Sequence, residues 1–81
     1  MNNKQYNLTY NEAVEKLMNK EGFIQGENFA KGYYVALDDM NIAYMYDAED
    51  MCRKDSIFFL CESSYKQKYR LIITSNEARF K

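Results

Sequence analysis

A single segment near the start of the chain has a helical pattern, and every later apolar run has the spacing of strands. Thr9 and Glu12 form a T-x-x-E capping box, in which each side chain accepts a hydrogen bond from a backbone N–H of the first turn. Hydrophobic residues then recur at helical spacing, at Tyr10, Ala13, Val14, Leu17 and Met18. The pattern predicts a helix over residues 10–21, with Gly22 as the left-handed residue that ends it.

The rest of the chain predicts short antiparallel strands. Runs rich in β-branched, aromatic and other apolar residues cover 23–25, 33–37, 42–46, 57–61 and 69–74. Residues 38–41, with two aspartates and an asparagine, predict a hairpin turn. Caps by Asp47 and Ser75 predict short helical turns over 48–53 and 76–80. We therefore expect an α+β fold, with one N-terminal helix packed on a four- to five-stranded antiparallel sheet.

Size and composition predict one small globular domain over residues 1–81. The 81 residues include 47% hydrophobic residues, enough for a core, and contain no repeat or linker. The chain lies near the lower size limit for a self-sufficient core, so a homo-oligomer is a natural supplement. No apolar run reaches the roughly 18–20 residues that span a bilayer, and the polar start lacks a signal-peptide pattern. We expect a cytoplasmic protein, in the host cell cytosol if it is viral, that does not bind membranes.

Several kinds of chemistry have no support in the sequence. The chain has no histidine, so the commonest proton shuttle at neutral pH is missing. Cys52 and Cys61 are expected to be reduced thiols, because two thiols without histidine make a poor zinc site. Gly22, Gly26 and Gly32 lack the spacing of a phosphate-binding loop. We expect a protein that is not an enzyme and holds no metal or cofactor.

Aromatic residues are in excess of what one helix can cover. Eight tyrosines and five phenylalanines gather mainly in the predicted strands, where both faces are apolar or aromatic. An antiparallel sheet with one wet face should alternate more cleanly. The second face is expected either to pack against a second copy, a partner or a ligand, or to close over the core of a strongly twisted sheet.

Charge is unevenly distributed along the chain. Residues 38–50 carry five acids and no base, which are Asp38, Asp39, Asp47, Glu49 and Asp50. Residues 51–81 carry seven bases and three acids, a net charge of +4. The acidic stretch is interpreted either as a solvated loop region or as a surface through which an inhibitor binds a host defence protein.

The segment 65–70 interleaves bases with aromatics. Lys66, Lys68 and Arg70 alternate with Tyr65, Gln67 and Tyr69, so a strand here would place the three bases on one face. Such a face could neutralise phosphates and stack on bases, as in an RNA-binding module. A solvated hairpin protected from aggregation by lysines is the alternative. The net charge of −1 favours a small anionic ligand over nucleic acid.

Residues 10–35 resemble the opening of the small phage Thoeris anti-defence proteins that act as nucleotide sponges. The matching positions are Tyr10, Ala13, Val14, Leu17, Lys31, Gly32, Tyr33, Tyr34 and Val35. Gln25 stands at the family's arginine and Asn28 at its tryptophan, with Phe29 beside it, and the family's Asp-Trp ending is absent. The resemblance implies a non-enzymatic homo-oligomer that sequesters a cyclic ADP-ribose-type signal in pockets at subunit interfaces. It also implies that Phe29 and Tyr33 stack on the ligand and that Gln25 contacts it.

Together these patterns predict a small anti-defence or inhibitor protein that sequesters a nucleotide-like immune signal. The candidate ligand-binding residues are Gln25, Phe29, Tyr33, Lys66, Lys68 and Arg70. Binding of a host protein by residues 38–50 and binding of RNA by residues 65–70 are the alternatives.

Overall fold

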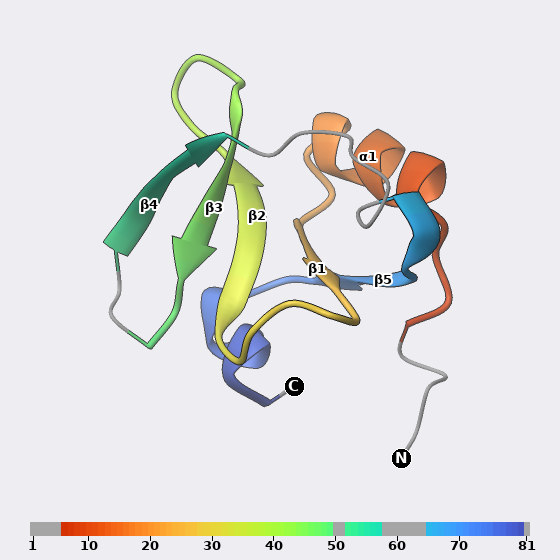
Figure 1. Cartoon of the computed structure of the whole chain (residues 1–81). Coiled ribbons are helices and arrows are strands. Elements are labelled where there is room, and N and C mark those ends of the chain that lie inside the picture. Colours follow the sequence, from red (N-terminus) through yellow and green to blue (C-terminus); the bar gives the residue numbers. More distant parts are fainter. Residues whose placement is uncertain (1–5, 50–51, 58–64, 81) are drawn as a thin grey trace.

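The computed structural model contains one α-helix, a five-stranded antiparallel sheet and a C-terminal 3₁₀-helix (Figure 1). It describes residues 6–49, 52–57 and 65–80. The elements are α1 (Tyr10–Met18), β1 (Phe23–Gly26), β2 (Tyr33–Leu37), β3 (Ala43–Asp47), β4 (Cys52–Ile57), β5 (Tyr69–Ile72) and η2 (Ser75–Phe80). The strand order is β4-β3-β2-β1-β5, and the predicted α+β fold is confirmed.

The predicted capping box starts helix α1. The Thr9 hydroxyl accepts a hydrogen bond from the Glu12 N–H at 3.2 Å, and the Glu12 carboxylate accepts one from the Thr9 N–H at 2.9 Å. The hydrogen bond from the Thr9 backbone is the main cause that lowers the pKa of Glu12, because it favours the charged carboxylate.

The end of α1 differs from the prediction. The helix ends at Met18, and the left-handed residue after it is Lys20 (φ 61°), not Gly22. Gly22 meets a different requirement, because a Cβ atom there would lie 2.5 Å from the backbone oxygen of Ile72. The chain therefore needs glycine at this position for a close approach to the end of β5.

The β2–β3 hairpin forms as predicted. The Asp38 carboxylate accepts hydrogen bonds from the N–H groups of Met40 and Ile42, both at 2.9 Å, and Asn41 takes the left-handed conformation (φ 63°). These bonds satisfy backbone donors that the tight turn leaves without partners. Strand β3 is shifted by one residue from the predicted 42–46.

Two predictions in the second half of the chain are wrong. The helical turn expected over 48–53 does not extend to residues 52–53, because these belong to β4, where Cys52 pairs with Asp47 of β3. The strand expected over 57–61 overlaps the structure only at Ile57, the last residue of β4, and residues 58–61 lie outside the described ranges. Pairing with the neighbouring strand β3, and not local propensity, determines where β4 lies.

Strand β5 ends two residues before the predicted end. The Glu77 carboxylate accepts hydrogen bonds from the N–H groups of Ile73 and Thr74, both at 3.1 Å. Both N–H groups are therefore bonded to a residue of η2 and do not extend the pairing of β5. The presence of η2 confirms the predicted C-terminal turn.

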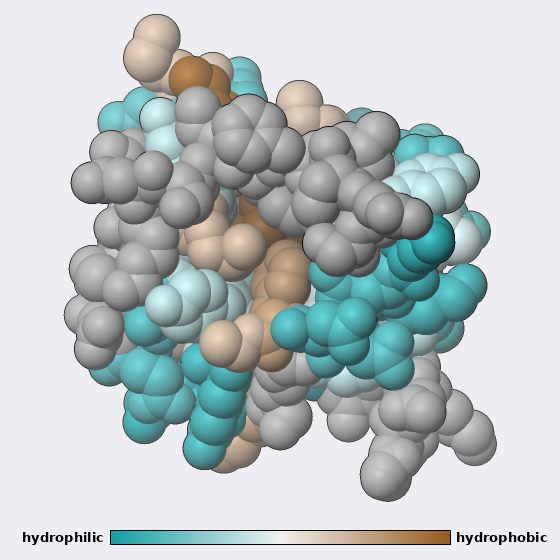
Figure 2. All heavy atoms as spheres, in the orientation of Figure 1, coloured by the Kyte–Doolittle hydropathy of each residue, from teal (hydrophilic) through white to brown (hydrophobic). Residues whose placement is uncertain are grey.

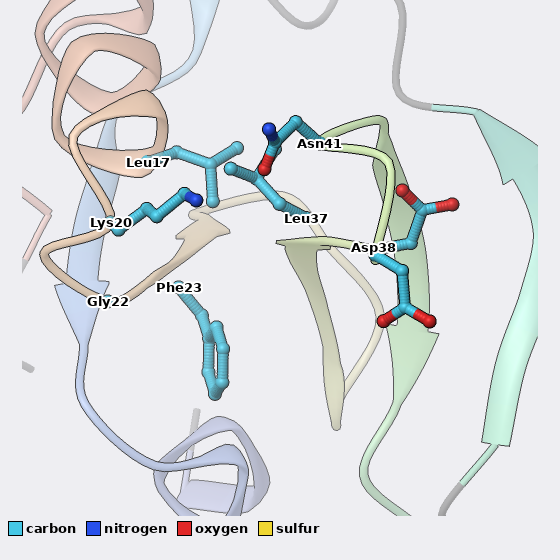
Figure 3. A pocket seen from close by; sticks show the side chains of 8 residues that line it. Leu17, Lys20, Gly22, Phe23, Leu37, Asp38 and Asn41 are labelled. Atoms are coloured by element: carbon cyan, nitrogen blue, oxygen red, sulfur yellow. The ribbon is translucent and has the colours of Figure 1, made fainter.

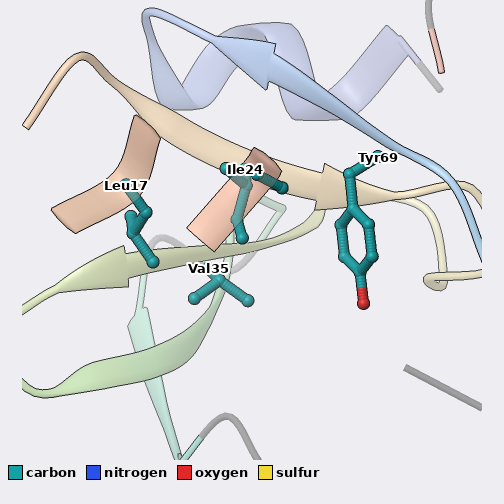
Figure 4. Packing of buried hydrophobic residues seen from close by; sticks show 5 residues of the cluster. Leu17, Ile24, Val35 and Tyr69 are labelled. Carbon is teal, nitrogen blue, oxygen red and sulfur yellow. The ribbon is translucent and has the colours of Figure 1, made fainter. Parts of the chain in front are cut away.

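Helix α1 and η2 cover opposite faces of the twisted sheet. Under α1 the buried core consists of Ala13, Leu17, Ile24, Val35 and Tyr69, most of which are labelled in Figure 4. On the opposite face Ile72 packs with Ala48 and Ala78, next to Phe23 and Tyr34. Figure 1 shows β1 and β5 crossing the direction of β2, β3 and β4. Part of the second face is thus covered by the chain itself.

The aromatic excess is used partly in packing on both faces. On the η2 face, the rings of Phe23 and Tyr34 lie 5.2 Å apart, and Tyr34 stacks on its cross-strand neighbour Tyr46 at 5.6 Å. Burial raises the pKa of Tyr34, against the opposing effect of a hydrogen bond with Ser75. On the α1 face, Phe29 and Tyr10 contact the fully buried Tyr69, each with ring centroids 6.0 Å apart.

The described residues visible on the face in Figure 2 are mostly polar. Figure 2 shows hydrophobic residues in a narrow central band and at one tip, with hydrophilic residues on both sides of the band. Within the described ranges, no helix combines the length and hydropathy that a membrane span requires.

The close approach at Gly22 gives a stability prediction. Gly22→Ala should lower the free energy of unfolding by about 1–3 kcal/mol, because β5 must move away from the added methyl group. Glu21→Ala is the control, since the exposed Glu21 side chain forms a surface ion pair with Lys16 at 3.6 Å, and its loss should cost less than about 1 kcal/mol. Urea denaturation measures both. Equal stability of Gly22→Ala and wild type would contradict the packing described at β5.

Candidate functional site

A pocket of about 360 Å³ lies between the connection from α1 to β1 and the turn from β2 to β3 (Figure 3). Strand β1 pairs with β5 through four residues, but with β2 only through Ile24 and Val35. Beyond this pair the two strands separate, and side chains of both connections line the opening. The lining residues are Leu17, Lys20, Gly22, Phe23, Leu37, Asp38, Asp39 and Asn41.

Two left-handed residues define opposite sides of this pocket. Lys20 and Asn41 are the non-glycine residues with positive φ in the described part of the chain, and both line the pocket. A left-handed lysine costs about 1–2 kcal/mol, and such residues often mark binding sites. Hydrogen bonds from the Lys20 N–H to Leu17 and from the Asn41 N–H to Asp38 hold the two turns. In Figure 3 the Lys20 and Asn41 side chains converge towards Leu37.

The lining of the pocket combines charged, polar and apolar groups that could hold a ligand. Lys20 is exposed and forms no ion pair with any residue in the described ranges, so its ammonium can donate to an anion. Asn41 supplies an amide, Phe23 an aromatic ring, and Leu17 and Leu37 an apolar wall.

The acids of the pocket belong to the β2–β3 turn. The Asp38 carboxylate binds backbone N–H groups of its own turn and points away from Lys20 in Figure 3, whereas Asp39 is exposed. Among the described residues no cluster of three His, Cys, Asp or Glu could hold a metal ion.

Two of the predicted ligand-binding residues meet inside the protein. Gln25 and Arg70 are cross-strand neighbours in β1 and β5, with exposed fractions of 0% and 9%. The Arg70 Nε donates to the Gln25 Oε1 at 2.8 Å, and the Gln25 Nε2 donates to the backbone oxygens of Tyr33 and Ala78 at 2.9 and 3.0 Å. The Gln25 amide is therefore buried, and it offers no exposed group for the direct ligand contact that was predicted.

The Tyr6 ring and η2 complete this buried network. Tyr6 lies over the Arg70 guanidinium at 5.2 Å, and its hydroxyl donates to Gln25 at 3.4 Å. Burial raises the pKa of Tyr6, and the positive charge of Arg70 opposes this effect. The Arg70 guanidinium also donates to the backbone oxygen of Glu77 in η2 at 2.9 Å. The network joins strands to η2 and has a structural role.

Of the remaining predicted ligand-binding residues, Tyr33 meets the network through its backbone oxygen, which accepts the hydrogen bond from Gln25. Phe29 packs edge-on against Tyr69, and Tyr33 is half-buried in β2. Lys66 and Lys68 are exposed and precede β5, so the prediction that both share a strand face with Arg70 is wrong. None of these residues lines the pocket.

The acidic stretch is divided between the two ends of β3. Asp38 and Asp39 lie in the turn before this strand, while Asp47 and Glu49 lie at its far end, about 17 Å away by strand geometry. Asp47 is buried and accepts a hydrogen bond from the Glu49 N–H, and Glu49 pairs with Arg79 at 3.8 Å. Asp50 lies outside the described residues.

Comparison with models of protein families, with curated protein sequences and with solved structures finds no match. The resemblance to the Thoeris anti-defence family stays a prediction. Sequence reasoning did not select Lys20, Phe23 or Asn41 as site residues, because they are far apart in the chain. The signal that could have indicated them is the position of Lys20 and Asn41 in connections that need left-handed residues.

The buried network gives a second stability prediction. Gln25→Leu should lower the free energy of unfolding by about 3 kcal/mol, because it leaves the Arg70 Nε and the backbone oxygens of Tyr33 and Ala78 without their hydrogen-bond partner. Lys68→Gln changes an exposed side chain and should stay within about 0.5 kcal/mol of wild type. Thermal and urea unfolding measure both. A stable, well-folded Gln25→Leu protein would show that the network is not structural.

Proposed function

We propose that this chain is a small non-enzymatic protein that binds and sequesters a nucleotide-like small molecule in the pocket between Lys20 and Asn41. The observation that carries the proposal is a pocket of about 360 Å³ whose lining includes both the Phe23 side chain and an exposed Lys20 that forms no ion pair within the described residues. Small-molecule sites begin at about 300 Å³ and combine apolar walls with a few polar groups.

The chemistry of the lining suits a ligand with a planar ring and a phosphate. The Lys20 ammonium would pair with the phosphate, and the Phe23 ring would contact the base. Contact of a base with an aromatic side chain contributes about 1–3 kcal/mol. The Asn41 amide, with donors and an acceptor, would bind polar edges of the base or sugar.

Sequestration fits the absence of a catalytic constellation in the pocket. Among the described residues that line it, none is a histidine, cysteine, serine or tyrosine that could act as nucleophile or proton shuttle. A protein of this kind would act by lowering the free concentration of its ligand. The resemblance of residues 10–35 to a phage anti-defence family supports an immune signal as the ligand and a homo-oligomer as the assembly.

The two alternative functions have less support. The acids through which residues 38–50 would bind a host defence protein lie at both ends of β3, and Asp47 is buried. They are therefore not gathered at one place on the surface. For binding of RNA by residues 65–70, the Tyr69 ring and the Arg70 guanidinium would have to be accessible, but both residues are buried.

Replacement of Lys20 separates binding from folding. Lys20→Gly should bind nucleotides up to about fivefold more weakly, because an ion pair of up to about 1 kcal/mol is lost. The same change should raise stability by up to about 1 kcal/mol, since glycine adopts positive φ without strain. Calorimetric titration with nucleoside monophosphates and urea unfolding measure the two effects.

The control for this prediction is Lys66→Gly, which removes the same charge from an exposed position outside the pocket. It should leave nucleotide affinity within about twofold of wild type, as expected for a charge screened by solvent. Equal loss of affinity in both variants would contradict the assigned site. No nucleotide binding by the wild-type protein would contradict the proposed function.

A further inference from the structure

The positive and negative side chains of the pocket lie on opposite sides of it. Lys20 supplies the positive charge from the connection between α1 and β1, and Asp38 and Asp39 supply two negative charges from the β2–β3 turn. The three charges sum to −1. A ligand that fills the pocket is therefore attracted at one end and, if it is negative there, repelled at the other.

We infer that the pocket selects a nucleotide with a single negative charge at its Lys20 end and hydroxyl or amine donors at its Asp39 end, and discriminates against polyphosphates. The inference rests on the proposed function and names the ligand class of the same site. A nucleoside phosphodiester has this charge pattern, because its phosphate keeps one ionisable oxygen and its ribose carries hydroxyl donors.

Asp39 is the residue that would determine this selectivity. The Asp38 carboxylate already accepts two hydrogen bonds from its own turn, whereas Asp39 is exposed and forms no hydrogen bond within the described ranges. A carboxylate accepts hydrogen bonds from ribose hydroxyls and repels phosphate oxygens. Both effects favour a ligand whose phosphate charge is confined to the Lys20 side.

The distance over which these charges act in salt solution is comparable to the size of the pocket. At 0.1 M salt the Debye length is about 10 Å, so charges on the two sides of the pocket both act on a bound nucleotide. A phosphomonoester carries a charge of about −1.5 to −2 at pH 7, and each added phosphate extends negative charge towards the Asp39 side. Discrimination should therefore weaken as salt increases.

Calorimetric titration with 3′,5′-cyclic AMP, AMP and ATP at low salt tests the inference. Cyclic AMP should bind most tightly and ATP most weakly, with the affinities of these two ligands differing by about fivefold or more. Asp39→Asn should reduce this ratio by about threefold or more, because it removes the repulsion without removing the hydrogen-bonding group.

Glu49→Gln is the matched control, since it removes the same charge at the other end of β3. It should leave the ratio of cyclic AMP to ATP affinity unchanged. Tighter binding of ATP than of cyclic AMP, or equal effects of the two variants, would overturn the charge selectivity while nucleotide binding stands. Absence of binding by all three nucleotides would overturn both the selectivity and the proposed function.

Discussion

The side-chain amide of Gln25 is the interaction on which the arrangement of the other elements depends. From the middle of β1 it binds the backbone of β2 and η2 through its nitrogen and the Arg70 side chain of β5 through its oxygen. A buried amide without partners would cost several kcal/mol, so all of these elements must be in place together. In the described part of the chain, every buried side-chain nitrogen or oxygen has a hydrogen-bond partner.

The pocket lies where β1 and β2 separate, and neither Gln25 nor Arg70 lines it. Strand β1 pairs with β5 through four residue pairs, while it pairs with β2 at Ile24 and Val35. The two strands separate on the side of that pair where Phe23 and Leu37 lie. The connections on both sides turn back through left-handed residues, which places Lys20 and Asn41 at the opening. A pocket built on strand separation exists before the ligand binds, so little binding energy is used to form it.

Local signals in the sequence predicted the local structure. The capping box fixed the start of α1, and the aspartates and asparagine of 38–41 indicated the hairpin turn, because short-range hydrogen bonds determine both. Contacts between strands decided the rest. Gly22 is required by the backbone of β5, and β4 lies where β3 pairs with it. Gln25 and Arg70 were selected as polar groups for a ligand, but they satisfy each other across β1 and β5. The pocket combines two distant turns, which no single segment of sequence indicates.

The central claim is that a nucleotide-like ligand binds between the two left-handed turns. Nuclear magnetic resonance of ¹⁵N-labelled protein titrated with cyclic AMP measures this directly, since each backbone amide reports its own surroundings. We predict saturable shifts that are largest at the amides of Lys20, Gly22 and Asn41, with small changes at residues 65–70. Shifts centred on residues 65–70, or saturable binding that leaves the amides of Lys20 and Asn41 unmoved, would contradict the claim.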